Sequence, residues 1–155
     1  MESCLFLFGD TALEGLPIFR RKQGAVIKNE RHKAGMAVRR KVLGDKYVDD
    51  SLACANDFNA PLQDYLTEHA WGAVWTRDGL PLKTRSMLNL AILTATNRGH
   101  ELQPHIRGAI NNGVSKDEMR EIFLQRGAYC GAPAALESFK LAGKVFDEME
   151  KDKAS

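Results

Sequence analysis

The sequence has little cysteine, no long apolar run and no strand-like alternation of apolar and polar residues. Its cysteines, Cys4, Cys54 and Cys130, are odd in number and widely spaced, which supports neither a disulfide framework nor a C-x-x-C redox or zinc pair. The run "CLFLF" (4–8) follows Glu2 rather than a basic segment, so it does not predict a signal peptide. Nothing approaches the roughly 20 consecutive apolar residues of a membrane span. These absences favour a cytoplasmic protein that does not associate with a membrane.

An excess of charge of one sign is also missing. Lys and Arg number 22 against 20 Asp and Glu, so the net charge is only +2. The basic residues are dispersed and lack the interleaved aromatics of single-strand binders, so no nucleic-acid partner is expected. With 155 residues, 44% of them apolar and 27% charged, the chain has the size and composition of one soluble globular domain.

The patterns that are present are helical from about residue 30 onward, and they predict an all-α fold. Residues 1–29 show no sustained period and are expected to form an extension outside a helical domain at 30–155. Caps and breakers predict about six to seven helices, at 30–44, 45–56, 59–77, 83–98, 100–111, 115–131 and 133–151. The clearest start signals are an N-cap at Asn29 and a capping box formed by Ser115 and Glu118.

The segment 83–98 is the most apolar of the chain, and it is predicted to be the central buried helix. Its apolar side chains cover most of the helical circumference: Met87, Leu88, Leu90, Ala91, Ile92 and Ala95.

The stretch "HELQPH" (100–105) resembles the zinc-protease motif H-E-x-x-H, but its spacing does not fit one. His100 and His105 are five residues apart, which puts them about 140° from each other around a helix, so they cannot hold one ion from one face. Pro104 requires the regular helix to begin only a few residues earlier. No metal site is therefore expected.

Glu101 and His105 do share a helical face, because they are four residues apart. A carboxylate one turn from an imidazole can hold its tautomer and raise its basicity, which suits a residue that transfers protons. The alternative is an exposed pair that contributes a few tenths of a kcal/mol to helix stability.

A second group of interest lies in "EHAWGAVWTR" (68–77). Glu68, Trp71 and Trp75 recur at i, i+3 and i+7 and are predicted to form one stripe of a helix. Such tryptophans are more often core residues than site residues, but a carboxylate buried beside two indoles would have a raised pKa. Several arginines near these helices could bind an anion or lie on the solvated surface.

The same stretches carry a family resemblance. Four blocks, "AGMAVRRKVLGDKYVD" (34–49), "EHAWGAVWTRDGL" (68–80), "TRSMLNLAILTATNRGHELQPHIRGAINNGVSKDE" (84–118) and "AYCGAPAA" (128–135), are similar to the carboxymuconolactone decarboxylase family. Related alkylhydroperoxidase-D-like proteins share its all-α fold but carry a C-x-x-C-x-x-x-H motif. Aligned on His105, this chain has Arg98 and Glu101 at the two cysteine positions, so dithiol peroxidase chemistry is not expected.

The resemblance implies decarboxylation of 4-carboxymuconolactone, a small anionic lactone, to 3-oxoadipate enol-lactone in protocatechuate catabolism. It also implies that no cofactor is needed and that the chain forms a homo-oligomer, a hexamer or a trimer. Two alternatives stay open: a decarboxylase or isomerase of the same family that acts on another lactone or cyclic keto acid, and a non-catalytic helical oligomer that binds a small anion.

For this reaction, His105 is the candidate proton donor or oxyanion partner and Glu101 the residue that orients it. Glu68 is an alternative acid beside Trp71 and Trp75, which would keep water away. The candidates for binding the substrate carboxylates are Arg85 and Arg98, followed by Arg39 and Arg107.

Overall fold

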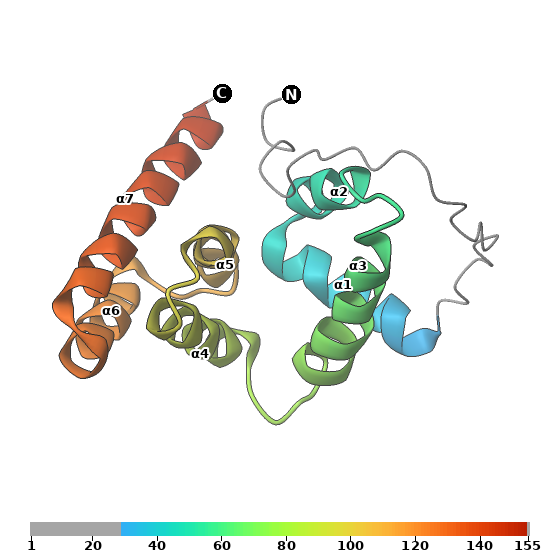
Figure 1. Ribbon diagram of the computed structural model, residues 1–155, viewed down its shortest axis with the longest axis horizontal. Helices are drawn as coiled ribbons and strands as arrows, with labels where there is room; N and C mark the ends of the chain where they lie inside the picture. Colours follow the sequence, from blue (N-terminus) through green and yellow to red (C-terminus); the bar gives the residue numbers. More distant parts are fainter. Residues whose placement is uncertain (1–28, 155) are drawn as a thin grey trace, which may run out of the picture.

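The computed structural model describes residues 29–154, and this part of the chain is helical throughout, without a strand. The helices are α1 (Glu30–Leu43), α2 (Asp45–Ala53), α3 (Ala60–Tyr65), η1 (Leu66–Trp75), α4 (Leu82–Ala95), α5 (Gly99–Asn111), α6 (Lys116–Cys130) and α7 (Ala132–Ala154). Figure 1 shows α1, α2 and α3 together on one side of the molecule and α4 to α7 on the other. The all-α fold class is therefore confirmed, whereas the proposed extension at residues 1–29 lies almost wholly outside the described residues.

The predicted start and stop signals act as expected. The Asn29 side chain accepts a hydrogen bond from the backbone N–H of His32, and Ser115 and Glu118 form both bonds of a capping box. Gly44 and Gly131 end α1 and α6 with φ angles of 87° and 98°, in the left-handed region that a side chain would disfavour.

The third predicted helix is continuous but not regular. Its first part is the α-helix α3, and its second part, η1, is a π-helix of ten residues. A π-helix pairs each N–H with the carbonyl five residues earlier, and it is rare beyond a single turn. The buried residues of η1 are Thr67, Trp71, Gly72 and Trp75, so the buried row has a spacing of four, and Glu68 is not part of it.

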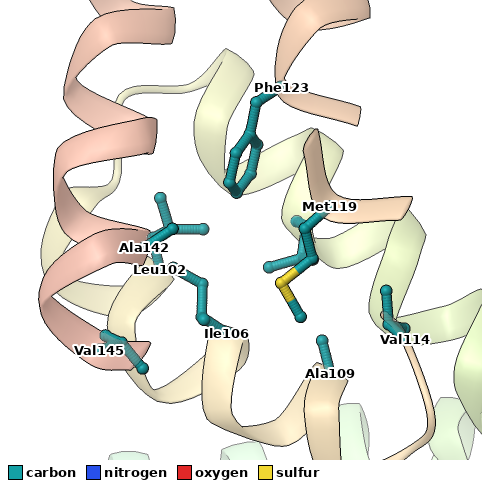
Figure 2. Packing of buried hydrophobic residues seen from close by; sticks show 9 residues of the cluster. Leu102, Ile106, Ala109, Val114, Met119, Phe123, Ala142 and Val145 are labelled. Carbon is teal, nitrogen blue, oxygen red and sulfur yellow. The ribbon is translucent and has the colours of Figure 1, made fainter. Parts of the chain in front are cut away.

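Two clusters of buried side chains form the interior. The smaller cluster joins α1, α2 and η1 through Val42, Leu43, Val48, Trp71 and Trp75. The larger cluster joins α4 to α7 and consists of Leu90, Leu102, Ile106, Ala109, Val114, Met119, Phe123, Ala142 and Val145. Figure 2 labels all of these side chains except Leu90 and shows them converging between the helices.

Helices α1 and α5 connect the two halves of the molecule. A Cβ atom on Gly108 would lie only 3.0 Å from Val42 Cγ1, so the two backbones approach closely at this point. The Asn111 side chain donates a hydrogen bond of 2.9 Å to the Val42 carbonyl, which fixes the same contact. This junction positions the side chains of α5 against those of η1.

The prediction that 83–98 forms the central buried helix is wrong. Only Ser86, Leu90 and Thr94 of α4 are buried, whereas Leu88 and Ile92 are 49% and 57% exposed. The apolar residues on the remaining circumference border a groove of about 470 Å³ between α4 and α6. Only one side of α4 is thus buried in the single chain. The amino-acid sequence of a helix does not show whether its apolar side chains are buried within the chain or against another molecule. No helix in the described part of the chain is long and apolar enough to span a bilayer.

Candidate functional site

His105 lies where the two halves of the molecule meet, on the face of α5 that approaches η1. Its ring is nearly parallel to the Trp71 indole, at 8° with centroids 6.1 Å apart, and it lies 6.5 Å from Trp75 at 25°. The two indoles are themselves 4.8 Å apart and are both buried. The indoles therefore fix the plane of a partly buried imidazole.

The edge of the imidazole is held by α4. The Asn89 side-chain nitrogen lies 3.2 Å from His105 Nδ1, and both side chains are partly buried. Burial lowers the pKa of His105 from 6.5 to about 4, and the nearby Glu101 carboxylate acts in the opposite direction. His105 is therefore neutral at pH 7, with one N–H.

The two carboxylates named from the sequence occupy different positions. Glu101 is exposed one turn before His105, so the structure brings this pair together as the spacing predicted, but the side chain that hydrogen-bonds to the ring is Asn89. Glu68 lies at the beginning of η1, where it accepts a 2.8 Å hydrogen bond from the Asn29 amide. The π-helical spacing thus places Glu68 toward the start of α1 and outside the row of the two indoles.

Arg39 is a buried cation surrounded by neutral groups. Only 5% exposed, it donates to Thr67 Oγ1 at 3.2 Å, Gln63 Oε1 at 2.9 Å and Ser51 Oγ at 3.3 Å. Burial is the main cause that lowers the pKa of Arg39. None of the carboxylates in the described part of the chain forms an ion pair with it. Thr67 precedes Trp71 by four residues, so Arg39 is held at the other end of the buried row that contacts His105.

Arg85 approaches the row of Thr67, Trp71 and Trp75 from the Trp75 end, opposite Arg39. It precedes Asn89 by four residues on α4, and its guanidinium donates a 2.9 Å hydrogen bond to the carbonyl of Arg77, two residues after Trp75. Its Nε atom is buried and has no hydrogen-bond partner, and within residues 29–154 no carboxylate pairs with it. A buried N–H without a partner costs about 1–3 kcal/mol, so this group is suited to an anionic ligand.

The other two arginines do not join this cluster. Arg107 binds two carboxylates of α7, Glu148 at 2.8 Å and Asp152 at 3.0 Å, which already neutralise its charge. Arg98 is exposed at the N-cap of α5 and borders a small cavity that faces Glu137 of α7.

Sequence reasoning missed Asn89, Thr67 and Tyr47. Tyr47 of α2 interacts electrostatically with both Arg39 and Glu101, which extends the cluster to α2, and burial raises its pKa. No residue pattern pointed to Asn89 or Thr67, because each is one of several polar residues in its helix and spacing does not show which of them turns inward.

Metal binding receives no support from the side-chain arrangement. Among residues 29–154, no three His, Cys, Asp or Glu side chains lie close enough together to hold an ion. His100 is exposed, five residues before His105.

These observations define a helical protein whose candidate site combines a neutral imidazole, two indoles and two arginines that pair with no carboxylate of residues 29–154, a combination suited to a small anionic molecule. The chain belongs to the carboxymuconolactone decarboxylase family, whose model matches residues 60–144. It is 44% identical to a 4-carboxymuconolactone decarboxylase of Acinetobacter baylyi over 120 residues, which cover 77% of this chain and 90% of that protein.

Two further relatives bear on the substrate. A nitrosuccinic acid decarboxylase of Metarhizium robertsii is 44% identical over 115 residues, covering 74% of this chain and 80% of its own. A 4-carboxymuconolactone decarboxylase of Pseudomonas putida is 51% identical over 45 residues, covering 29% of this chain and 94% of its own. Both the family and the named relatives are therefore decarboxylases, in agreement with the resemblance that the sequence blocks carry.

Proposed function

We propose that the protein is a carboxy-lyase that converts 4-carboxymuconolactone to 3-oxoadipate enol-lactone without a cofactor. The observation that carries this proposal is the 44% identity to a decarboxylase of that substrate over most of both chains. The arrangement around His105 supports it, because neutral hydrogen-bond donors and arginines that pair with no carboxylate in the described part of the chain suit a dianionic lactone. This reaction belongs to protocatechuate catabolism, the pathway that we propose for the protein.

The substrate can act as its own electron sink. Its lactone carbonyl is conjugated through a ring double bond to the carbon that bears the departing carboxylate. When the bond to that carboxylate breaks, carbon dioxide leaves and the electron pair spreads to the lactone oxygen as a dienolate. A proton from solvent, added next to the carbonyl, then completes the product. The protein must orient the dianion and stabilise the charge on the lactone oxygen.

His105 is suited to the second task. Because its pKa lies at about 4, its neutral N–H is available as a hydrogen-bond donor to the lactone oxygen at pH 7. Of the two roles that the sequence left open, this favours the oxyanion partner over the proton donor. Glu101, one turn away, increases the basicity of the ring, and Trp71 and Trp75 keep water from one side of it.

Arg85 is best placed to bind a substrate carboxylate, and Arg39 contributes positive charge from its buried position. The carboxylate that they attract should be the retained acetate arm. A cation bound to the departing carboxylate would stabilise the charge that has to leave it, and would therefore slow the reaction.

A second candidate substrate is nitrosuccinate, favoured by the equal identity to the fungal relative. Its reacting carbon bears a carboxylate, an acetate arm and a nitro group, whereas that of the lactone bears a carboxylate, an acetate arm and the conjugated ring. Both compounds thus pass the electron pair to an oxygen and retain an acetate arm. The same donor and the same arginine could serve either compound.

The deciding experiment compares both substrates with the purified full chain. We expect loss of the lactone, followed by ultraviolet absorbance with substrate prepared fresh from protocatechuate, and a kcat lower by about 10²-fold or more in His105→Ala, the scale of a lost donor. Turnover of nitrosuccinate alone would overturn the proposed substrate and select the second one. Full activity of His105→Ala would remove this residue from the mechanism.

We also propose that the chain self-associates, as a hexamer or a trimer, and works in the cytoplasm. Self-association is supported by the exposed apolar residues of α4 and by the groove that they border with α6. The location is proposed from the composition alone, which is that of an ordinary globular domain.

A further inference from the structure

The hydrogen bond between Asn89 and His105 determines which nitrogen of the imidazole carries the proton. Asn89 lies in α4 and His105 in α5, and the distance from the amide nitrogen to His105 Nδ1 is 3.2 Å. An amide nitrogen can only donate a hydrogen bond. Nδ1 must therefore accept, and its lone pair points at Asn89.

It follows that the proton of the neutral ring is on Nε2. A neutral imidazole has one N–H and one lone pair, and here the lone pair is used by Asn89. The two indoles are stacked with the ring at interplanar angles of 8° and 25°, so they restrict its tilt. Nε2–H is then the donor that remains available at the edge opposite Asn89.

On the basis of the proposed function, we propose that Asn89 is a positioning residue that holds His105 as the Nε2–H tautomer and aims this N–H at the oxygen where charge collects. The bond to the departing carboxylate breaks, its electron pair reaches that oxygen, and carbon dioxide leaves. Nε2 keeps its proton throughout. Solvent water supplies the proton that finally reaches carbon. The same Nε2–H donor would serve any substrate in which the electron pair moves to an oxygen atom, whether that substrate is the lactone or the nitro compound.

Asn89→Asp tests this assignment with little change in shape. A carboxylate at this position accepts a hydrogen bond and cannot donate one, so it should draw the proton to Nδ1 or leave the ring doubly protonated. The matched control is Asn112→Asp, because Asn112 is another partly buried asparagine whose amide donates to a side chain, Ser86 Oγ at 2.9 Å.

The readout is long-range ¹H–¹⁵N correlation of the full chain labelled at its four histidines, with His105 assigned from the spectrum of His105→Gln. At pH 7 we expect the Nε2–H pattern for His105 in the unaltered protein and in Asn112→Asp, and its loss in Asn89→Asp. In the turnover assay, kcat of Asn89→Asp should fall by about 10²–10³-fold, the scale of one oxyanion donor, with a much smaller change in KM.

Three results would overturn the assignment: an Nδ1–H or doubly protonated His105 in the unaltered protein, an unchanged His105 pattern in Asn89→Asp, or a changed pattern with full kcat. The spectra need no substrate, so they decide the tautomer even where 4-carboxymuconolactone is not turned over. In that case the assay repeated with nitrosuccinate decides the effect on kcat. A failure of the proposed substrate is therefore distinguishable from a failure of the positioning role.

Discussion

At the scale of single residues, the candidate site is defined by polar groups whose usual partners are missing. Arg39 and Arg85 have no ion pair with a carboxylate in the described part of the chain, and His105 has a neutral amide beside it. Burying such groups costs free energy unless they are satisfied. Arg39 and His105 have neutral hydrogen-bond partners, whereas the buried Nε atoms of Arg39 and Arg85 have none in the described part of the chain, and this supports the proposal of an anionic ligand.

His105 should make the protein sensitive to mild acid. Its folded-state pKa of about 4 lies below the ordinary 6.5, so its contribution to stability is fully present above pH 6.5 and is lost as the pH falls toward 4. The full loss is on the order of 3 kcal/mol, because one pKa unit corresponds to about 1.4 kcal/mol. In urea unfolding followed by circular dichroism, His105→Gln should therefore show a flatter dependence on pH between 6.5 and 4. Parallel curves for both proteins would contradict the lowered pKa.

Arg85 should affect substrate binding more than turnover. Arg85→Gln removes a charge held at the carbonyl of Arg77, two residues after Trp75. Because a hydrogen bond to a charged group contributes about 1.5–3 kcal/mol, KM should rise by about 10–100-fold. Steady-state kinetics measures this rise. The control is Arg120→Gln, which removes an exposed arginine of α6 that pairs with Asp117. Equal KM values for the two variants would exclude Arg85 from binding.

At the scale of elements, the π-helix and the crossing of α1 with η1 position the indoles. A Cβ atom on Gly35 would collide with the carbonyl of Thr67 and the backbone of Gly72, so the two helices touch through glycine. The four-residue spacing of Thr67, Trp71 and Trp75 then lets Arg39 and His105 contact one buried row. This row depends on a close backbone contact and on the wider helical turn.

Gly35→Ala should therefore lower stability markedly, because backbone atoms cannot move aside as a side chain can. We expect a loss of at least 1–3 kcal/mol in denaturant unfolding, together with lower activity as η1 shifts. Gly143→Ala is the matched control: it lies inside α7, an added Cβ there meets nothing within 4 Å, and alanine should stabilise the helix by about 0.5–1 kcal/mol. A Gly35→Ala variant as stable as the unaltered protein would contradict the tight crossing.

At the scale of the whole molecule, the chain consists of two packed halves joined by α1 and α5, with His105 at the junction. The half formed by α4 to α7 leaves an apolar surface uncovered. Leu88 and Tyr129 border the groove between α4 and α6 and are 49% and 84% exposed. Exposed apolar patches of this kind usually mark an interaction surface.

Leu88→Glu should weaken self-association, because it puts a charge into the apolar groove. By size-exclusion chromatography with light scattering, the unaltered protein should have three or six times the mass of one chain, and Leu88→Glu should shift to smaller species. Leu62→Glu is the control, since it alters a similarly exposed leucine (53%) on α3. A monomeric unaltered protein, or equal masses for both variants, would contradict an interface in this groove.

The sequence by itself determined the local features of this protein: the caps at Asn29 and Ser115, the helix ends at Gly44 and Gly131, and the proximity of Glu101 to His105. These depend on residues at most five positions apart, so spacing and backbone chemistry are sufficient to predict them. Tertiary structure alone decided that Asn89 contacts His105, that Arg39 meets Thr67, and that one side of α4 stays uncovered. Those features depend on how helices far apart in the sequence pack together. Between α1 and η1 the crossing depends on Gly35, on Gly72 and on the π-helical turn, which a regular 3.6-residue pattern does not contain.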